Sequence, residues 1–287
     1  MIAKNNLNLR LMKTFIGGIA WPTILLFVSA WSGYLIALWA FHAHLIGKLP
    51  LSMITTLAVI MIFTPIHEAS HANIEGKSRG TFITGGIGYL SGLMFLAPFR
   101  AFKSVHLVHH QNTNDPDRDP DYWVHGSNMF STSLRCLAIY PYYIYAYYFD
   151  LKRPWREKIV EVALIAVYWS VLIYGLMSPL AEMLIWGVVL PLFLGTGMHA
   201  FLFDWVPHYP HHDMRPLHNS RALPHRFYDI AMFGQNFHLV HHLNPRVPFH
   251  RYRKAYYACG LNSIESEEGL ASGGILQTRG LKRRVEV

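Results

Sequence analysis

The sequence predicts an all-α integral membrane protein with four transmembrane helices, arranged as two hairpins with a helical cap that is rich in histidine. Three observations support this fold class. The 287 residues are 52% hydrophobic and only 15% charged, whereas roughly 25% of the residues in an average soluble domain are charged. Eighteen histidines outnumber the seventeen acidic residues. Charged side chains are absent from four long stretches, at 14–47, 49–67, 162–181 and 183–203.

Each charge-free stretch is long enough for a helix that crosses a bilayer, since a hydrocarbon core of about 30 Å takes roughly 20 helical residues. Four such runs disfavour the alternative of buried helices in a large soluble protein. The first run is also longer than the roughly 7–15 apolar residues of a cleaved signal peptide. We therefore expect a membrane domain over residues 1–262 and a flexible cytoplasmic tail at 263–287. The spans are expected near 16–38, 49–66, 162–180 and 183–203.

The distribution of basic residues predicts the orientation in the membrane. Of the 25 lysines and arginines, only Lys48 falls in a connection that this arrangement places outside. The positive-inside rule therefore predicts that both termini, the central segment and the helical cap are cytoplasmic, as in a bacterial inner-membrane protein. The net charge of +8 follows from this asymmetry, and we expect no nucleic-acid partner.

Residues 81–98, "TFITGGIGYLSGLMFLAP", could be counted as a fifth span. A crossing there would place His67 and His71 on the opposite side of the membrane from His106. The four glycines of the segment also make it a poor helix former. We therefore expect a re-entrant or interfacial segment that packs against protein.

Three short histidine motifs predict a metal centre. "HEASH" begins at residue 67, and the pentapeptide "HLVHH" occurs at 106–110 and again at 238–242. On a helix, histidines spaced three and four residues apart share one face. The motifs supply the following imidazoles: His67, His71, His106, His109, His110, His238, His241 and His242. This pattern predicts that each motif is a metal-binding face and that folding brings the three faces together.

Eight imidazoles suit two metal ions with four ligands each, because a single zinc ion takes four ligands at most. Imidazole binds iron, copper, zinc and nickel alike, so the ligand type leaves the metal open. Among these metals, iron is favoured for a pair of redox-active ions that reacts with O₂. The two cysteines, Cys136 and Cys259, are too few for a cysteine-rich metal site, and we expect free thiols.

The motifs resemble a known family. "HEASH", "HLVHHQN" and "QNFHLVHH" resemble the three histidine boxes of the membrane fatty-acid desaturase and hydroxylase superfamily. The longer segments "HLVHHQNTNDPDRDPD", "FDWVPHYP" and "GQNFHLVHHLNPRVPFHRYRKAYYA" are similar to the non-haem di-iron β-carotene hydroxylases, and more distantly to the membrane alkane hydroxylases. The resemblance covers roughly residues 60–258. It implies two non-haem iron ions, O₂ as co-substrate and the eight box histidines as ligands.

The resemblance also implies further site residues. Related enzymes carry another histidine at the end of the last span, preceded four residues earlier by an asparagine. Here His208 would be a ninth ligand, and Asp204 stands in place of the asparagine. Asp204 would bind iron through water or orient His208. Asp204 and Glu68 are candidates for proton delivery, and Glu68 and Gln235 are placed to hydrogen-bond an imidazole. His199, about 13 Å from His208 along a helix, is left out of the metal site.

The acidic segment "NDPDRDPD" at 114–121 could be taken for a calcium-binding loop. Asp115, Asp117 and Asp119 imitate the start of a calcium loop. Position six of that loop is Pro120 instead of glycine and position twelve is Gly126 instead of glutamate, so calcium is rejected. We expect Asp/Pro turns that cap the next helix.

These features predict an enzyme that uses O₂ to oxidise an unactivated C–H bond in an apolar lipid from the bilayer. Hydroxylation of a carotenoid ring is the leading candidate reaction. A fatty acyl desaturase or an acyl-chain or alkane hydroxylase is the alternative enzyme. The non-enzymatic alternative is a membrane metal-binding or transport protein. Such a protein should have polar or ionisable residues inside its spans, and the expected spans contain almost none. The chain carries no flavin, nicotinamide or iron–sulfur motif. A ferredoxin-like donor with its reductase would supply electrons, and the basic clusters at 152–156 and 251–254 suit an acidic partner.

Overall fold

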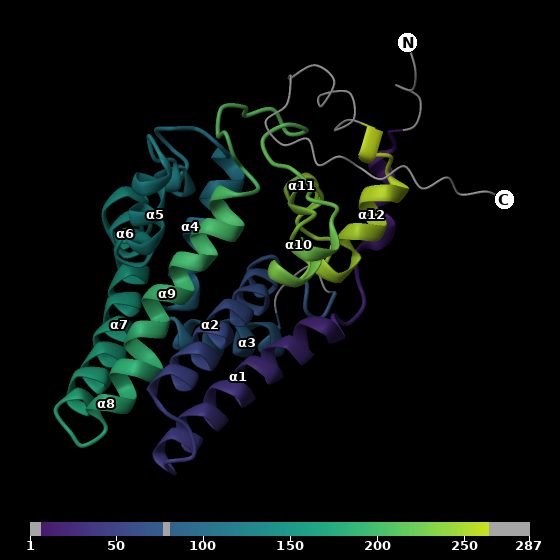
Figure 1. Cartoon of the computed structure of the whole chain (residues 1–287). Coiled ribbons are helices and arrows are strands. Elements are labelled where there is room, and N and C mark those ends of the chain that lie inside the picture. The colour runs from purple at the N-terminus through teal and green to yellow at the C-terminus, as the bar shows by residue number, and fades with distance from the viewer. Residues whose placement is uncertain (1–6, 77–80, 264–287) are drawn as a thin grey trace.

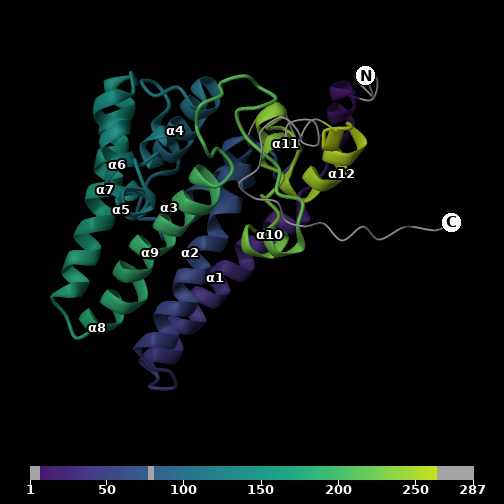
Figure 2. The same cartoon turned by 45° about the horizontal axis from the view of Figure 1, so that its top comes forward.

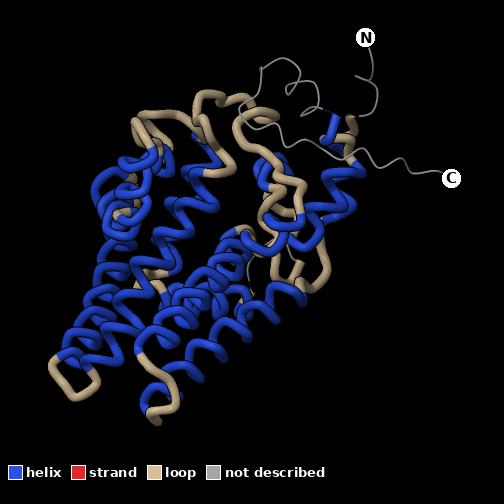
Figure 3. Tube along the Cα trace, viewed as in Figure 1, coloured by secondary structure: helices blue, strands red, loops and turns tan. Residues whose placement is uncertain are grey.

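The long helices of this protein carry the apolar stretches of the sequence. The computed structural model describes residues 7–76 and 81–263, and within them the chain is helical, with no strand (Figure 3). Four of the described helices are long and apolar enough to cross a membrane: α1 (Trp21–His42), α2 (Lys48–Ser70), α7 (Trp155–Leu176) and the continuous run Ala181–Trp205. The predicted all-α membrane fold with four spans is confirmed.

The bounds of the spans differ from the predicted ones where the reasoning used only charge. α1 begins at Trp21 instead of near 16, because Pro22 lies in its first turn, where proline is favoured. α7 begins at Trp155 instead of near 162, because its first turn includes the charged residues 156–158. Charge ends the apolar part of a helix but not the helix itself. The predicted tail lies outside the described residues from 264 onward.

The remaining elements connect the spans and cover one end of them. The run Ala181–Trp205 consists of α8 (Ala181–Leu184), η4 (Ile185–Val189), α9 (Leu190–His199) and η5 (Ala200–Trp205). The other elements are η1 (Leu9–Phe15), α3 (Phe82–Met94), α4 (Phe99–Asn112), η2 (Pro120–Val124), α5 (Met129–Leu137), α6 (Ile139–Tyr145), η3 (Ala146–Asp150), α10 (Arg226–Ala231), α11 (His238–Leu243), η6 (Phe249–Arg251) and α12 (Tyr252–Ala258).

The spans form two hairpins whose turns lie at the same end. Figures 1 and 2 show the α1–α2 and α7–α8 connections at that end, and α10, α11 and α12 gathered at the opposite end. α2 is the central span, and it contacts α1, α3 and α9. Protein buries 56% of the apolar window of α2 but only 11% of that of α7. The outer faces of α7 and α1 are therefore the ones left for lipid.

Within residues 81–98, Phe82–Met94 form the helix α3, although four glycines made the segment a poor helix former. α3 ends at Met94, and α4 follows at an angle of 97°. A side chain at Gly92 would lie 2.5 Å from the Ala97 carbonyl oxygen, and one at Gly88 would lie 2.6 Å from the Phe99 ring. The glycines thus allow α3 and the start of α4 to pack closely, and this contact outweighs their poor helix propensity. The sharp bend makes the segment a folded-back pair and not a straight fifth span.

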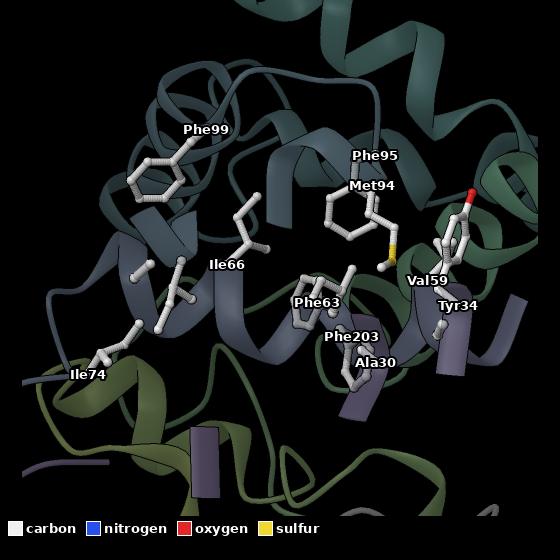
Figure 4. Packing of buried hydrophobic residues seen from close by; sticks show 14 of the residues in the cluster. Ala30, Tyr34, Val59, Phe63, Ile66, Ile74, Met94, Phe95, Phe99 and Phe203 are labelled. Atoms are coloured by element: carbon white, nitrogen blue, oxygen red, sulfur yellow. The ribbon is translucent and has the colours of Figure 1, made fainter. Parts of the chain in front are cut away.

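An aromatic core holds the end of α2 against its neighbours (Figure 4). The rings of Phe63 on α2 and Phe203 on η5 are stacked with their centroids 4.4 Å apart. Phe95 and Phe99, at the bend between α3 and α4, belong to the same buried cluster. Between helices in a bilayer, such rings stabilise the contact by van der Waals packing, because lipid tails are as apolar as the rings. Phe63 lies one helical turn before His67, so this core fixes the position of the first histidine motif.

Candidate metal centre

The three histidine motifs meet at the end of the bundle that carries α10–α12. His67 lies in the last turn of α2 and His71 directly follows it. The first "HLVHH" lies at the end of α4 and the second forms α11. His208 follows η5 and joins them. The eight histidines of the three motifs, and His208 expected from the family resemblance, therefore gather in one place.

The histidines separate into two groups in the described part of the chain. The five-histidine group consists of His67, His71, His106, His110 and His241. The four-histidine group consists of His109, His208, His238 and His242. Within each group the candidate ligand nitrogens all lie within 4.8 Å of one another. The sequence predicted two ions but not this division.

Helical phase explains how each pentapeptide supplies both groups. On α4, His106 and His110 are one turn apart and enter the five-histidine group, whereas His109 enters the other. On α11 the assignment is reversed, because His238 and His242 enter the four-histidine group and His241 enters the five-histidine group. Each copy of the motif therefore contributes histidines to both groups, and neither group is built from one copy alone.

The ring nitrogens converge as metal ligands do. Nε2 of His67 lies 2.9 Å from Nε2 of His241, and Nε2 of His71 lies 2.8 Å from Nε2 of His106. Nitrogens that bind one ion at about 2.0–2.1 Å come roughly 3 Å apart. In the four-histidine group, Nε2 of His208 is buried without a hydrogen-bond partner. A metal ion would satisfy this nitrogen, so the donor sets fit two ions.

The far ring nitrogen of several histidines is held by a fixed partner. In the four-histidine group, Nδ1 of His109 lies 2.9 Å from the Asp119 carboxylate, and Nδ1 of His208 lies 2.8 Å from the Asn219 carbonyl oxygen. A ring that donates from Nδ1 keeps the lone pair of Nε2 free for a metal. Asp119 also caps η2 as expected, by accepting from the Asp121 backbone N–H at 2.8 Å. No feature of the sequence indicated its contact with His109.

The electrostatic surroundings keep most of these rings neutral. Burial, and then neighbouring imidazoles, lower the pKa of His208, His238 and His242 well below the ordinary value. Burial alone would also lower the pKa of His109, but the carboxylates of Asp119 and Asp121 raise it to about 9. Neutral imidazole is the form that binds metal. Only His109 must give up a proton at neutral pH among these four.

Glu68 and Gln235 do not hydrogen-bond an imidazole directly. The Oε1 atom of Glu68 lies 3.9 Å from Nδ1 of His67, and the Oε2 atom accepts from the Phe249 backbone N–H at 3.3 Å. Gln235 contacts Thr64 instead. The Tyr252 hydroxyl lies 2.9 Å from Nδ1 of His241. Burial, and then Glu68 beside it, raise the pKa of Tyr252 well above its ordinary value. Tyr252 therefore stands between Glu68 and His241.

Asp204 faces a different partner from the one expected. It was expected to bind iron through water or to orient His208, and the Asn219 carbonyl oxygen orients that ring instead. The Tyr143 hydroxyl lies 3.3 Å from Asp204 and donates to Asp121 at 2.5 Å. Asp121 is in turn 3.3 Å from Nδ1 of His109. A chain of polar groups thus leads from Asp204 to the four-histidine group.

Asp204 and Asp121 line a largely apolar pocket. Its walls come from α2, the α3–α4 bend, α4, α6, α7 and α9. His106 of the five-histidine group also lines it. His199 was excluded from the metal centre, and the structure places it in the pocket wall, 3.1 Å from the Ile60 carbonyl oxygen. The pocket could not be found from motifs, because its residues come from elements far apart in the sequence.

A four-span membrane protein with two converging imidazole groups beside an apolar pocket has the construction of a membrane metalloenzyme that acts on lipids. Residues 46–260 match the model of the fatty acid desaturase family. Since this match covers most of the 287 residues, the chain belongs to the fatty acid desaturase family and is an oxidoreductase of the non-haem di-iron type. The predicted family and the predicted enzyme class are confirmed.

Two relatives show the range of chemistry in the family. A "Beta-carotene ketolase" from Paracoccus sp. (strain PC1) is 29% identical over 223 residues, which cover 73% of this chain and 79% of the ketolase. An "sn-1 oleoyl-lipid 12-desaturase" from Picosynechococcus sp. (strain ATCC 27264 / PCC 7002 / PR-6) is 22% identical over 268 residues, which cover 83% of this chain and 75% of the desaturase. These relatives act on different lipids, so they support a lipid oxidoreductase without specifying its reaction.

Proposed function

We propose that this protein uses two iron ions and O₂ to oxidise an unactivated C–H bond of an apolar lipid, with a carotenoid ring as the first candidate substrate. The observation that carries the proposal is the position of His106. This residue belongs to the five-histidine group and also lines the apolar pocket. A lipid in the pocket would therefore have its reacting carbon beside the metal centre. The ketolase relative supports a carotenoid as this lipid.

The nine histidines would hold the ions, and iron bound there would supply the redox chemistry with O₂. For hydroxylation, the balance is R–H + O₂ + 2 e⁻ + 2 H⁺ → R–OH + H₂O. The buried carboxyl groups of Glu68, Asp119 and Asp121, together with Asp204 at the pocket, would offset the charge of two divalent ions. Asp204 and Tyr143 lie where protons would pass from the pocket towards Asp121 and His109.

Acyl-chain desaturation is the second candidate, and the desaturase relative supports it. Its balance is –CH₂–CH₂– + O₂ + 2 e⁻ + 2 H⁺ → –CH=CH– + 2 H₂O. Both reactions need the same metal centre and the same external electrons. Desaturation also removes a hydrogen from the neighbouring carbon, whereas hydroxylation does not. Whether that second hydrogen lies near the metals depends on how the lipid is positioned in the pocket. Either lipid would contact the same apolar walls.

We further propose that the metal centre faces the cytoplasm of a bacterial cell, in its inner membrane. Arg100 and Lys103 lie on α4, the helix that carries the first "HLVHH", and Lys152 and Arg153 line the same pocket. Lys48 begins α2 at the other end of the bundle, close to Glu182. This asymmetry supports a cytoplasmic position for the histidine end. A separate ferredoxin-like donor would then deliver electrons from that side.

Metal analysis and pigment analysis test the proposed function. Protein purified in detergent should contain about two irons per chain, and a single zinc would contradict the proposal. Expression in a host that accumulates β-carotene should then give an oxygenated carotenoid on pigment chromatography. Unchanged β-carotene together with new unsaturated fatty acids would replace the first candidate with the second.

A further inference from the structure

A basic pocket lies on the outer side of α4. It is lined by Arg100, Lys103, Ser104, Leu107, Val108, Gln111, Leu151, Lys152, Arg153 and Glu157. Four of these residues are cationic and one is anionic. The anion, Glu157, forms an ion pair with Arg153 at 2.7 Å. The pocket therefore carries a positive rim around a partly apolar floor, and we call it the α4 basic pocket.

The floor of this pocket is the back of a helix that carries metal ligands. His106, His109 and His110 project from α4 into the two histidine groups. Leu107 and Val108, from the same turns, line the α4 basic pocket. An α-helix with its side chains is about 10–12 Å across. A molecule in the pocket would thus be separated from both histidine groups by a single helix.

The other two elements that bear histidine motifs are covered on their outer sides. In the last turns of α2, every residue from Ile62 to Ser70 is buried. On α11, Leu239 and Val240 are buried in a cluster with Tyr252 of α12. α4 is therefore the motif-bearing element whose outer face is open to a partner.

The second basic cluster, at 251–254, is engaged within the fold. The Arg251 guanidinium donates to the carbonyl oxygens of Phe15 and Gly17 at 2.9 and 2.8 Å. Arg253 pairs with Asp229 at 3.1 Å. Arg251 thus stabilises the packing of α12, whereas Lys152 is exposed at the rim of the α4 basic pocket, beside the ion-paired and exposed Arg153. The two clusters expected to suit an acidic partner are thus not equivalent.

We propose that the α4 basic pocket is the docking site of a small acidic one-electron carrier protein of the [2Fe–2S] ferredoxin class. The inference rests on the proposed function, whose balance needs two electrons from outside. A carrier that gives one electron, [2Fe–2S]⁺ → [2Fe–2S]²⁺ + e⁻, must dock and leave twice per turnover. Such encounters use small interfaces, and complementary charge at the rim raises their association rate. The α4 basic pocket carries such a rim, and a single helix lies between it and both histidine groups.

Direct binding tests the proposal without any need for turnover. The purified, iron-loaded protein in nanodiscs of zwitterionic lipid is titrated with a plant-type [2Fe–2S] ferredoxin by calorimetry. The double substitution Lys103→Glu/Lys152→Glu should raise the Kd at least about tenfold at low ionic strength. The difference should shrink at about 0.5 M salt, where exposed charges are screened. Lys254→Glu, an exposed charge reversal in the other cluster, is the matched control and should leave the Kd unchanged.

The single substitution Lys152→Glu is a second test, which distinguishes loss of ferredoxin binding from misfolding of the variant. Lys152 is exposed, so its reversal should preserve the iron content and the thermal unfolding midpoint while raising the Kd by about threefold. An unchanged Kd in the double variant, or an equal loss in Lys254→Glu, would overturn the proposal. So would a pocket that binds only anionic lipid vesicles. Pocket-dependent ferredoxin binding by a protein that leaves β-carotene unchanged would support the docking site while overturning the proposed substrate.

Discussion

The two histidine groups differ in what surrounds them, although the same pentapeptide contributes to both. The four-histidine group is held by charge and backbone, since Asp119 and Asp121 contact His109 and a carbonyl oxygen orients His208. No carboxylate hydrogen-bonds directly to a ring of the five-histidine group among the described residues, and Tyr252 separates Glu68 from His241. The five-histidine group instead adjoins the apolar pocket through His106.

This difference suggests a division of work within one centre. A metal ion beside carboxylates is stabilised in its charged state, because opposite charges attract strongly where water is excluded. A metal ion beside an apolar pocket is placed to react with a lipid. We infer that the four-histidine group anchors charge and that the five-histidine group faces the substrate. The predictions below test this division through the number of ligands and through the groups that hold them.

The largest effect is expected from removing a ligand of the four-histidine group. His208→Ala leaves three imidazoles there, so iron should fall from about two to about one per chain, and product formation should fall at least about 100-fold. Iron analysis and pigment chromatography measure the two effects. His212→Ala, an exposed histidine outside both groups, is the control and should behave as the unsubstituted protein. Retention of two irons in His208→Ala would remove His208 from the ligands.

A smaller effect is expected from removing a ligand of the five-histidine group. His110→Ala leaves four imidazoles, which is as many as the other group has in full. Iron should stay near two per chain, while the rate of iron loss to a chelator should rise about tenfold. Loss of a whole iron, as in His208→Ala, would show that the fifth imidazole is not spare and that the groups are equivalent.

The sequence predicted the parts of this centre that depend on local periodicity. Charge-free stretches located the spans, and helical spacing singled out eight histidines that the fold brings together, because both patterns are properties of a single helix. His208 needed the family resemblance, since its motif is a single histidine. The folded-back course of 81–98 also agrees with the prediction, but glycine propensity gave no sign of the regular helix α3, which packs against Phe99.

The remaining features depend on contacts between distant segments. Which ring enters which group is set by the relative rotation of α4 and α11, which no local pattern encodes. Asp119 looked like a turn residue, and only the fold brings it to His109. His199 and Tyr143 become neighbours of the pocket through helices that are far apart in the sequence. The repeat of "HLVHH" therefore predicted a metal centre but not its asymmetry.

A pH-dependent effect should distinguish the groups further. With a pKa of about 9, His109 is protonated at pH 7 in the metal-free protein, so metal must displace that proton. Loading of the four-histidine group should strengthen as pH rises from 7 to 9, by up to about tenfold per unit. Asp119→Asn removes the main cause of the raised pKa and should flatten this slope, with about tenfold weaker binding at pH 9. Metal titration at several pH values measures both changes, and an identical slope in the variant would contradict the role of Asp119.

The smallest effect is expected at Tyr252, where the support of the five-histidine group is a neutral hydroxyl. Tyr252→Phe removes a hydrogen bond to His241 worth about 1 kcal/mol, which corresponds to about a fivefold change in rate. Both irons should remain, because His241 keeps its place in the packed core beside α12, and only kcat should fall. Thr113→Val, which removes a weaker 3.3 Å contact to His242 in the other group, is the matched control and should change kcat less than about twofold. Release of an iron by Tyr252→Phe would show that the hydroxyl supports its metal site as strongly as a carboxylate does. The proposed difference in support between the two groups would then be wrong.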